Sequence, residues 1–287
     1  MFEKGFMKNK VVLITGGGSG LGYAMAQKFS EFGSTVIICG RTEEKLKKAV
    51  ENLPRPYNQT HLYFLCDVRD EWKVKKMIDD IFIIQKKLDV IINNAAGNFF
   101  SLSEELSLRA FKTVVEIVLD GTFNVSMAAA RHWKKLKQPG NIINIVTTYA
   151  ESGSGYVLPS AVSKAGVLAM TKSLAYEWGE LGIRVNSIAP GPFPTKGAWD
   201  RLMPDPGFEE KYKNSLPLKR FGNPEELANL ALFLASDLSA YINGENIIID
   251  GAEHLKSGQF NMLQQFFKRD ELHGIFQKIR ERLRNNK

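Results

Sequence analysis

The chain has 287 residues, 44% of them hydrophobic and 24% charged, and 38 Lys and Arg against 31 Asp and Glu give a net charge of +7. This composition excludes disordered, collagen-like and coiled-coil proteins, and the length fits either two ordinary domains or one large α/β domain. The basic excess contains no block of Lys and Arg, so it favours nucleic acid only weakly and suits a small polyanionic ligand equally well.

Seven short runs rich in β-branched residues alternate with stretches long enough to form crossover helices. The runs are nearly continuously apolar, which is typical of parallel strands covered by helices on both faces. They comprise residues 11–14, 35–38, 62–65, 90–92, 142–146, 184–188 and 246–249. Since crossovers between parallel strands are right-handed, we predict a single doubly wound, Rossmann-like parallel sheet of about seven strands, with helices on both faces and the ligand at the carboxyl ends. Cys39 and Cys66 lie in these apolar runs and form no disulfide framework or metal quartet, so we expect buried free thiols and no metal.

The chain contains no linker rich in Pro, Gly or Ser, so we predict one α/β domain over residues 1–255. Residues 256–287 follow as a polar turn and a helical extension. An apolar stripe with spacings of three and four residues runs along that helix, formed by Leu272, Ile275, Phe276, Ile279 and Leu283. We expect the stripe to pack on the domain or on a neighbouring subunit; a lid over the substrate is the alternative.

The first predicted strand runs into a glycine-rich segment, TGGGSGLG at residues 15–22, which opens a helix. Its glycines allow a tight turn and let the backbone approach a pyrophosphate, and the N-terminus of the helix offers free N–H groups to that anion. A glycine run alone could be a plain turn, but the strand–turn–helix context favours a dinucleotide site. The residues expected to bind the cofactor here are Thr15, Gly16, Gly18, Ser19, Gly20, Leu21 and Gly22.

The ends of the next two predicted strands indicate which dinucleotide binds. NAD enzymes place a carboxylate after the second strand to hold the ribose 2′-OH, whereas this chain has Arg41 there and no acid. A guanidinium suits a phosphate, so we predict NADP(H); an exposed loop charge is the alternative role of Arg41. After the third strand, Asp67 either accepts a hydrogen bond from the adenine amino group or caps the next helix, and the sequence favours neither role.

Two further motifs complete a resemblance to the short-chain dehydrogenase/reductase family that spans about residues 8–255. They are NNAAG at residues 93–97, after the fourth predicted strand, and PGP at residues 190–192, after the sixth. The resemblance implies that the first motif closes the floor of a nicotinamide cofactor site and that residues 190–196 cover the nicotinamide. The residues it assigns to the cofactor are Asn94, Ala95, Gly97, Pro190, Gly191, Phe193, Thr195 and Lys196.

The chain departs from the usual active site of that family at three positions. Lys164 of the usual Tyr-x-x-x-Lys pair is present, but Ser160 replaces the tyrosine, Thr147 stands at the usual serine and Val118 at the usual helix asparagine. Carbonyl reduction needs a phenol whose proton is tuned by the lysine, and a serine hydroxyl is a far weaker acid and one ring shorter. We therefore expect a reaction other than the ordinary ketone–alcohol conversion, with Tyr156, eight residues before the lysine, in the pocket or core.

These departures, and the segments around them, resemble the 2,4-dienoyl-CoA reductase branch of the family. The matching segments are NFF at 98–100, TTYAESGSG at 147–155, PSAVSK at 159–164, PGPFPTKGAWDRL at 190–202 and SGQFN at 257–261. Peroxisomal members carry Asp where this chain has Val118, so the chain resembles the mitochondrial type and its bacterial relatives. The resemblance implies NADPH-dependent reduction of 2,4-dienoyl-CoA to 3-enoyl-CoA in the oxidation of unsaturated fatty acids.

The same resemblance assigns roles to the polar residues. Hydride addition at C5 of a dienoyl thioester moves negative charge to the thioester oxygen, where fixed hydrogen-bond donors stabilise it; Tyr149 and Asn98 are those donors. Lys164 would bind the nicotinamide ribose, and Ser160 would be a secondary hydrogen-bonding group. The resemblance also implies that Arg69 and Arg201 contact the CoA phosphates. It places Phe99 and Ser107 near the acyl chain. A solvated loop charge is the alternative role of Arg69.

Two other functions are compatible with the sequence. One is a different short-chain carbonyl reductase, of the 3-ketoacyl type, with Tyr149 or Tyr156 as its acid; the missing tyrosine at position 160 argues against it. The other is a non-catalytic NADP-binding module whose site has decayed. The joint presence of Lys164, Asn98 and Tyr149 argues against random decay.

Partners and location are inferred from family habit and from sequence signals. The family habit suggests a homotetramer with the central helices, about residues 111–135 and 162–178, at its interfaces. No apolar run reaches the roughly 18 residues of a membrane-spanning helix, and no signal or transit segment is recognisable. We expect a cytoplasmic protein that binds a small acyl-CoA substrate, without nucleic acid or membrane insertion; a processed mitochondrial form is the alternative.

Overall fold

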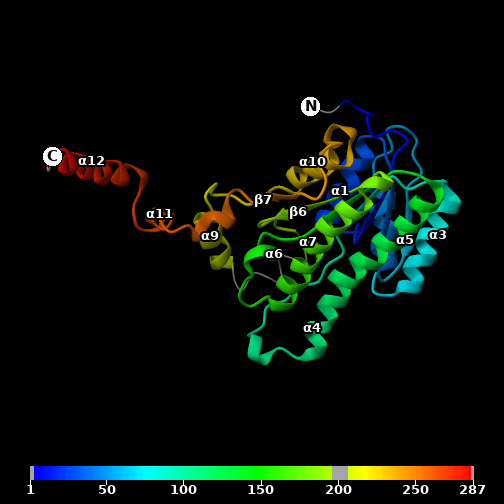
Figure 1. Cartoon of the computed structure of the whole chain (residues 1–287), viewed down its shortest axis with the longest axis horizontal. Coiled ribbons are helices and arrows are strands. Elements are labelled where there is room, and N and C mark those ends of the chain that lie inside the picture. The colour runs from blue at the N-terminus through cyan, green and yellow to red at the C-terminus, as the bar shows by residue number, and fades with distance from the viewer. Residues whose placement is uncertain (1–2, 196–205, 286–287) are drawn as a thin grey trace.

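The computed structural model describes residues 3–195 and 206–285 and is built on one parallel sheet of seven strands (Figure 1). The strands are β1 (Val11–Thr15), β2 (Thr35–Gly40), β3 (Leu62–Leu65), β4 (Val90–Asn93), β5 (Gly140–Ile145), β6 (Ile183–Pro190) and β7 (Asn246–Ile249). Their spatial order is β3-β2-β1-β4-β5-β6-β7, so the direction in which the chain adds strands reverses between β1 and β4. Such a reversal opens a crevice at the carboxyl ends of the strands. The predicted fold is confirmed.

Helices cover both faces of this sheet, and the alternation of strand side chains decides which helix each residue meets. The α-helices are α1 (Gly20–Glu31), α2 (Glu43–Asn52), α3 (Glu71–Gln85), α4 (Leu108–Val115), α5 (Gly121–Leu136), α6 (Tyr149–Ser152), α7 (Leu158–Trp178), α9 (Pro206–Ser215), α10 (Pro224–Ala235), α11 (Leu263–Phe266) and α12 (Arg269–Asn285). Val12 and Ile14 of β1 belong to the core cluster that includes α1 and α10. Val11 and Leu13 belong to the cluster that includes α3 and α5, as a period of two requires.

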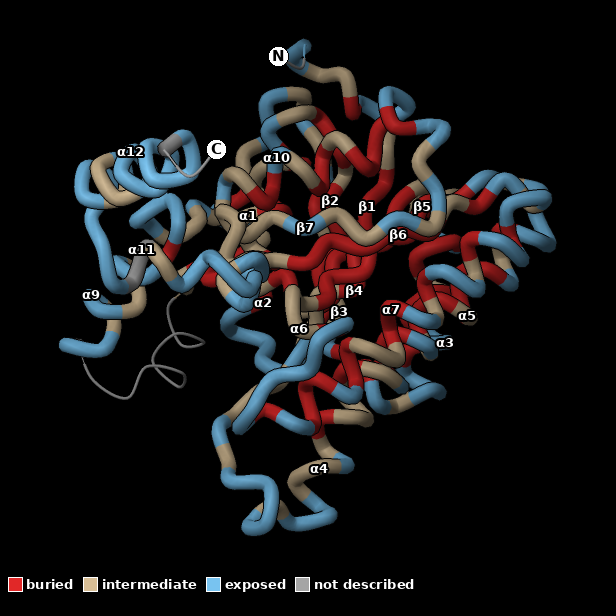
Figure 2. Tube along the Cα trace, turned by 60° about the vertical axis from the view of Figure 1, so that its left-hand side comes forward, coloured by how far each residue is buried: buried red, intermediate tan, exposed pale blue. Residues whose placement is uncertain are grey.

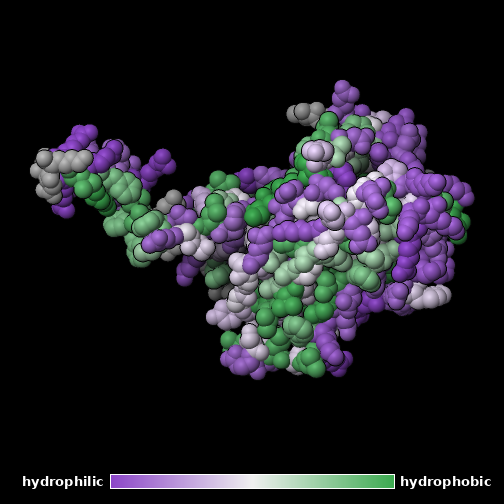
Figure 3. Space-filling view, in the orientation of Figure 1, coloured by the Kyte–Doolittle hydropathy of each residue, from purple (hydrophilic) through white to green (hydrophobic). Residues whose placement is uncertain are grey.

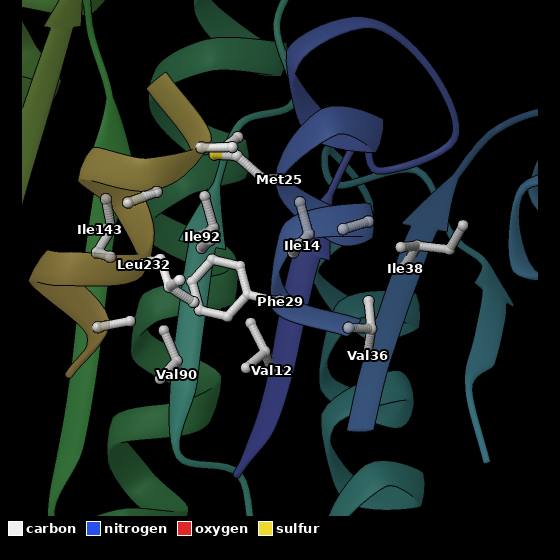
Figure 4. Packing of buried hydrophobic residues seen from close by; sticks show 14 of the residues in the cluster. Val12, Ile14, Met25, Phe29, Val36, Ile38, Val90, Ile92, Ile143 and Leu232 are labelled. Carbon is white, nitrogen blue, oxygen red and sulfur yellow. The ribbon is translucent and has the colours of Figure 1, made fainter. Parts of the chain in front are cut away.

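The packing explains why the strand sequences are apolar throughout. Figure 4 shows the Phe29 ring of α1 lying among the strand residues Val12 and Val90. In Figure 2 the inner strands of the sheet are buried while the outer sides of the helices are exposed. The edge strands β3 and β7 are only partly buried. Cys39 and Cys66 are buried free thiols, as predicted, and burial raises the pKa of Cys66 to about 11.

One long helical segment, made of α4, η2 (Glu116–Asp120) and α5, crosses the front of the molecule beside α7. The middle piece, η2, is a π-helical turn that contains Val118, and the Thr122 hydroxyl donates to the Val118 carbonyl at 2.6 Å. π turns inside α-helices are frequent at functional sites. By length and composition this segment could span a membrane, but half of the apolar window lies inside the fold, as in a core helix.

The C-terminal extension leaves the sheet domain after β7. The chain passes through η5 (Glu253–Ser257) and α11 into α12, which Figure 1 shows lying away from the domain. The predicted apolar stripe is present on α12, and Phe276, Ile279 and Leu283 keep 43%, 46% and 63% of their surface exposed. The stripe therefore offers an apolar face that its own domain does not cover at these three residues.

His61, just before β3, is a buried polar residue that ties three segments together. Its Nδ1 accepts a hydrogen bond from the Val36 N–H at 3.1 Å, and its Nε2 lies 3.0 Å from the Pro54 carbonyl and 2.9 Å from the Ser30 hydroxyl. The Nδ1 atom can accept only when it carries no proton, so the ring is neutral with its proton on Nε2. Burial lowers the pKa of His61, and the hydrogen bond to Pro54 offsets part of that effect.

His61 is therefore expected to make the fold less stable in mild acid. The stability contributed by a lowered pKa is fully present above the unfolded value, about 6.5 for histidine, and is lost as the pH falls from there through the folded value. Chemical denaturation between about pH 7 and pH 5 should show a steeper loss for the wild type than for His61→Gln. His132 and His254, each beside a carboxylate, are unchanged in both proteins, so equal slopes would contradict this role of His61.

Candidate active site

A cleft of about 520 Å³ opens at the carboxyl ends of β1, β2, β4, β5 and β6. It lies at the reversal of strand order between β1 and β4, where a doubly wound sheet holds its ligand. Thirteen of the predicted cofactor residues line it: Gly16, Gly18, Ser19, Gly20, Leu21, Arg41, Asp67, Asn94, Ala95, Gly97, Lys164, Pro190 and Thr195. The sequence prediction therefore brought together residues that the fold also places around one cleft.

The glycine-rich turn after β1 has a backbone that other residues could not adopt without strain. Gly16 and Gly20 have φ values of 65° and 56°, in the left-handed region that favours glycine. A Cβ atom on Gly22 would come within 2.5 Å of both the Gly16 carbonyl oxygen and the Asn94 side chain. Gly22 therefore allows the turn to pack closely against Asn94, and Gly16, Gly18 and Gly20 form a cradle that lines the cleft at the N-terminus of α1. Backbone N–H groups and the helix dipole at that end suit a pyrophosphate.

Four predicted cofactor residues do not line the cleft but support its wall. The Thr15 hydroxyl accepts hydrogen bonds from the N–H groups of Asn94 and Ala95 at 3.0 and 2.9 Å, which ties β1 to the end of β4. Gly22 is buried at the cradle, as described above. Phe193 packs in the hydrophobic core, and a Cβ on Gly191 would come within 2.5 Å of Asp250. Lys196 lies outside the described residues.

The end of β2 carries the positive charge that the sequence predicted. Arg41 is exposed and lines the cleft with Thr42 and Lys45. Lys45 lies in the first turn of α2, four residues after Arg41, and both cations line the cleft. The sequence analysis missed Lys45; its position four residues after Arg41 is the signal that could have identified it.

Asp67, at the end of β3, holds its carboxylate against Arg69 in a bidentate pair. The Arg69 Nε atom lies 3.1 Å from each carboxylate oxygen and Nη2 lies 2.6 Å from Oδ2. The hydrogen bonds from Arg69 lower the pKa of Asp67, against an opposing effect of burial. The capping role considered for Asp67 is wrong, because Asp70 is the N-cap of α3 and accepts from the Lys73 N–H at 3.0 Å. The contact with adenine stays a prediction.

Three polar side chains from distant parts of the sequence meet at the inner end of the cleft. The Tyr149 hydroxyl lies 3.4 Å from the Asn98 amide nitrogen, which donates to it, and 3.2 Å from the Ser160 hydroxyl. Asn98 follows β4, Tyr149 follows β5 at the start of α6, and Ser160 lies in the first turn of α7. The phenol missing from the helix position is thus supplied from the preceding strand end. Two donors, Tyr149 and Asn98, converge there on one site.

Lys164 lies one turn along α7 from Ser160 and lines the same cleft. It is 5% exposed, and its ammonium donates to the Ile145 carbonyl at 2.5 Å. Burial lowers the pKa of Lys164 to about 8. Thr147 also lines the cleft, and among the described residues its buried hydroxyl has no hydrogen-bond partner. A buried unpaired hydroxyl in an open cleft is suited to a ligand atom.

Tyr156 was expected in the pocket or core, and the structure corrects this. Its side chain is 61% exposed, it does not line the cleft, and its φ of 67° is in the left-handed region. It follows the turn of Gly153 and Gly155, and its carbonyl accepts from the Ser101 N–H at 2.9 Å. The backbone of this turn, rather than the phenol, joins the loops that follow β4 and β5.

A second cleft, of about 410 Å³, adjoins the first through Gly97, Asn98 and Ile117, which line both. It lies between the loop after β4 and helix α4, and it contains two of the predicted substrate residues, Phe99 and Ser107. The Ser107 hydroxyl accepts from the Ala110 N–H at 3.2 Å and caps α4. Of the other predicted substrate residues, Arg69 is paired with Asp67 and Arg201 lies outside the described residues.

Comparison with known proteins agrees with this architecture. Residues 16–252 match the family model described as enoyl-(acyl carrier protein) reductase, of the short-chain dehydrogenase type. The chain is 45% identical over 255 residues to a probable (2E)-enoyl-CoA-producing 2,4-dienoyl-CoA reductase of Bacillus subtilis. The alignment covers 88% of this chain and 100% of that protein. It is 42% identical over 264 residues to a probable (3E)-enoyl-CoA-producing 2,4-dienoyl-CoA reductase of Caenorhabditis elegans. That alignment covers 90% of this chain and 85% of the relative.

Solved structures show the same fold. A crystal structure of a short chain dehydrogenase from Bacillus anthracis superposes with a TM-score of 0.80 at 45% identity, over 88% of this chain and 99% of that one. A gluconate 5-dehydrogenase from Burkholderia cenocepacia, crystallised with NADP and tartrate, gives a TM-score of 0.79 at 30% identity, over 85% of this chain and 95% of that one.

Proposed function

The chain belongs to the short-chain dehydrogenase/reductase family of nicotinamide-dependent oxidoreductases, and we propose that it reduces 2,4-dienoyl-CoA to 3-enoyl-CoA with NADPH in the oxidation of unsaturated fatty acids. The observation that carries the proposal is the pair of hydrogen-bond donors, Tyr149 and Asn98, beside Ser160. A carbonyl reductase needs an acidic phenol at the position of Ser160. A dienoyl thioester instead needs donors at an oxygen remote from the carbon that is reduced.

The chemistry of a conjugated thioester explains this arrangement. A nicotinamide cofactor held by the residues of the first cleft would supply the hydride. Addition of hydride at C5 of the substrate would shift the electron pairs through C4, C3 and C2 to the thioester oxygen and give a dienolate. Hydrogen bonds from the Tyr149 hydroxyl and the Asn98 amide would stabilise that oxyanion, and donors fixed in advance need no reorganisation as the charge develops. Protonation at C2 then leaves the double bond between C3 and C4.

The position of that protonation distinguishes the two products named for the relatives. Protonation of the dienolate at C2 gives a 3-enoyl-CoA, and protonation at C4 gives a 2-enoyl-CoA. The Bacillus subtilis relative is named for a (2E) product and the Caenorhabditis elegans relative for a (3E) product. We assign the 3-enoyl product to this chain from its resemblance to the mitochondrial type, and the position of the product double bond, read by NMR, tests the assignment.

The residues of the cleft fit a dinucleotide phosphate. Gly16, Gly18 and Gly20 line the cleft beside the N-terminus of α1, where backbone N–H groups suit a pyrophosphate. Arg41 and Lys45, with no acid at the end of β2, favour the extra phosphate of NADPH over the free ribose of NADH. Lys164 would donate to the nicotinamide ribose, and Thr147 offers its unpaired hydroxyl nearby. In this proposal Arg201, Phe99 and Ser107 contact the acyl-CoA substrate. The resemblance adds Arg69, whose guanidinium is paired with the Asp67 carboxylate in the structure.

The proposed reaction is tested by absorbance at 340 nm. Wild-type protein mixed with NADPH should oxidise it when a 2,4-dienoyl-CoA is added, and should show no comparable rate with a 3-ketoacyl-CoA. A faster rate with the keto substrate would identify a carbonyl reductase. Binding of NADPH without oxidation, with any of these substrates, would identify a binding module.

We also propose a homo-oligomer, a tetramer by family habit. Figure 3 shows apolar side chains gathered over α4 and α7, and Leu108, Phe123 and Val162 on α4, α5 and α7 are 67%, 49% and 46% exposed. Exposed apolar patches of this kind mark interaction surfaces. We propose that residues 256–287 form a separate helical extension and that the stripe on α12 packs on a neighbouring subunit.

Deleting residues 258–287 is expected to weaken the assembly while the domain stays folded. The family model ends at residue 252, and the Bacillus subtilis relative matches over its whole length without the remaining part of this chain. The cut keeps Glu253, which accepts from Tyr212 at 2.9 Å, and Lys256, which donates to Ser215 at 2.9 Å, so α9 stays anchored. Light scattering over a range of protein concentrations gives the mass of the assembly for the wild type and for the truncated protein. If both have the same mass and dissociate over the same concentrations, the role of the tail is contradicted.

A further inference from the structure

We infer that the cleft between the loop after β4 and helix α4 holds the CoA arm of the substrate, and that the Arg109 guanidinium at its rim binds a CoA phosphate. The inference rests on the proposed reduction of a dienoyl-CoA and adds to it a direction for the substrate and an anion-binding residue. Arg109 lines the second cleft together with Asn98. The sequence analysis assigned it no role.

The connection between the two clefts fixes where the thioester lies. Gly97, Asn98 and Ile117 line both, so Asn98 is at the junction. Lys164 and Pro190 line only the first cleft, on the side where the nicotinamide would be held. Phe99, Arg109 and Val114 line only the second. A thioester oxygen that accepts from Asn98 is therefore placed between the two spaces.

The chemistry of the substrate then determines its orientation. The hydride goes to C5, and four bonds separate C5 from the thioester carbon C1. With C1 held beside Asn98 and C5 over the nicotinamide, the diene occupies the first cleft. The sulfur is attached to C1 on the side away from C5, so the arm that it carries points into the second cleft. Phe99 and Ser107 would therefore contact the pantetheine part of CoA rather than the acyl chain.

The lining of the second cleft suits such an arm. Phe99, Val114 and Ile117 give it an apolar floor, on which the methyl groups of pantetheine can pack. Ser107 and Thr113 line it as well, but the Ser107 hydroxyl accepts from Ala110 and the Thr113 hydroxyl donates to the Arg109 carbonyl at 2.9 Å. The polar groups of the walls are thus mostly used within α4, and the guanidinium at the rim is the group suited to an anion.

The charges around the site favour Arg109 over Arg69 as the phosphate ligand. Arg69 is held by the Asp67 carboxylate, and Glu116 lies 4.0 Å from its Nη1 atom. A phosphate at Arg69 would therefore approach two carboxylates as well as one guanidinium. Arg109 is exposed, and within residues 3–195 and 206–285 no carboxylate forms an ion pair with it. Its five N–H donors are available to a phosphate in the bidentate geometry that guanidinium groups prefer.

The test compares a full CoA thioester with a pantetheine thioester that lacks the nucleotide. Arg109→Ala should raise the KM for 2,4-dienoyl-CoA by roughly tenfold, because one charge-assisted contact is lost at an exposed site, and leave its kcat nearly unchanged. The KM for the pantetheine thioester should not move. Arg109→Lys should recover part of the loss, because it keeps the charge without the bidentate geometry. Arg131→Ala, which removes an exposed arginine of α5, is the matched control.

Two comparisons can overturn the inference while the proposed reaction stands. One is an Arg109→Ala enzyme that reduces dienoyl-CoA with an unchanged KM. The other is an Arg69→Ala enzyme that alone shows the loss, which would place the phosphate at Arg69. If the wild type does not reduce dienoyl-CoA at all, the proposed function fails. Calorimetric titration of CoA into wild type and Arg109→Ala then decides the inference alone: weaker binding in the variant supports the site, and equal binding overturns it.

Discussion

A Tyr149→Phe enzyme is expected to lose about 10²–10³ in kcat with dienoyl-CoA, or roughly 3–4 kcal/mol of transition-state stabilisation, while it binds NADPH normally. The substitution removes one hydroxyl and keeps the ring. The hydroxyl accepts from Asn98 at 3.4 Å and contacts Ser160 at 3.2 Å, so it belongs to the group of donors that would face the dienolate oxygen. Asn98→Ala should lose activity on the same scale, because it removes the second donor.

Ser160→Ala is the informative comparison. If the reaction passes through a dienolate, the Ser160 hydroxyl only supports Tyr149, and its loss should cost about tenfold, as for one neutral hydrogen bond of about 1 kcal/mol. Lys164→Ala should instead raise the NADPH KM and lower turnover together, because Lys164 is assigned to the cofactor. Steady-state kinetics of the two variants at 149 and 160 should be measured side by side. An inactive Ser160→Ala enzyme beside a nearly normal Tyr149→Phe enzyme would return the chemistry to the usual helix position.

The fold could be predicted because its information is local. The seven apolar runs, read as strands buried on both faces, correspond to the seven strands of the sheet, and the turn at residues 15–22 depends on glycines that are visible in the sequence. Gly16, Gly20 and Gly22 are required by backbone angle or by close approach. Such requirements restrict one residue type at one position, and a single sequence therefore reveals them.

Several parts of the site that the sequence did not reveal depend on the exact backbone path of short turns. The pairing of Asp67 with Arg69, and the identity of Asp70 as the cap of α3, follow from the exact path of one short turn. The exposure of Tyr156 follows from its left-handed backbone after a glycine turn. Propensity and spacing do not determine such details, since several polar residues within a few positions can exchange partners.

A second reason, the packing of separate segments, explains why Arg109 was missed. It lies 11 residues from Asn98 in sequence, on a helix that begins after a loop and a short 3-10 turn, and no pattern links the two. Only the packing of α4 against the loop after β4 places both on one cleft. Three-dimensional structure was needed to separate a cation already held by a carboxylate, Arg69, from one that is available to a ligand.

Arg41→Ala is expected to raise the KM for NADPH by about 10- to 150-fold and to leave that for NADH nearly unchanged. A charge-assisted contact with a phosphate contributes about 1.5–3 kcal/mol, and NADH has no phosphate at the ribose 2′ position. Arg41 lines the cleft at the end of β2, and residues 39–42 contain no acid to hold a free ribose hydroxyl. Glu43 and Glu44 follow in the first turn of α2 and are not among the residues that line the cleft. The measurement is the KM for each cofactor at saturating dienoyl-CoA, in wild type and variant.

Lys45 provides the second arm of this experiment, because it lines the same cleft four residues after Arg41. Lys45→Ala should give a smaller loss of the same kind, since an ammonium makes a point contact where a guanidinium can bind a phosphate in two places. High salt should weaken NADPH binding to the wild type more than to Arg41→Ala, because screening acts on the charge that the variant lacks. A wild type that used NADH as well as NADPH would show that Arg41 does not select the cofactor, whatever the variants did.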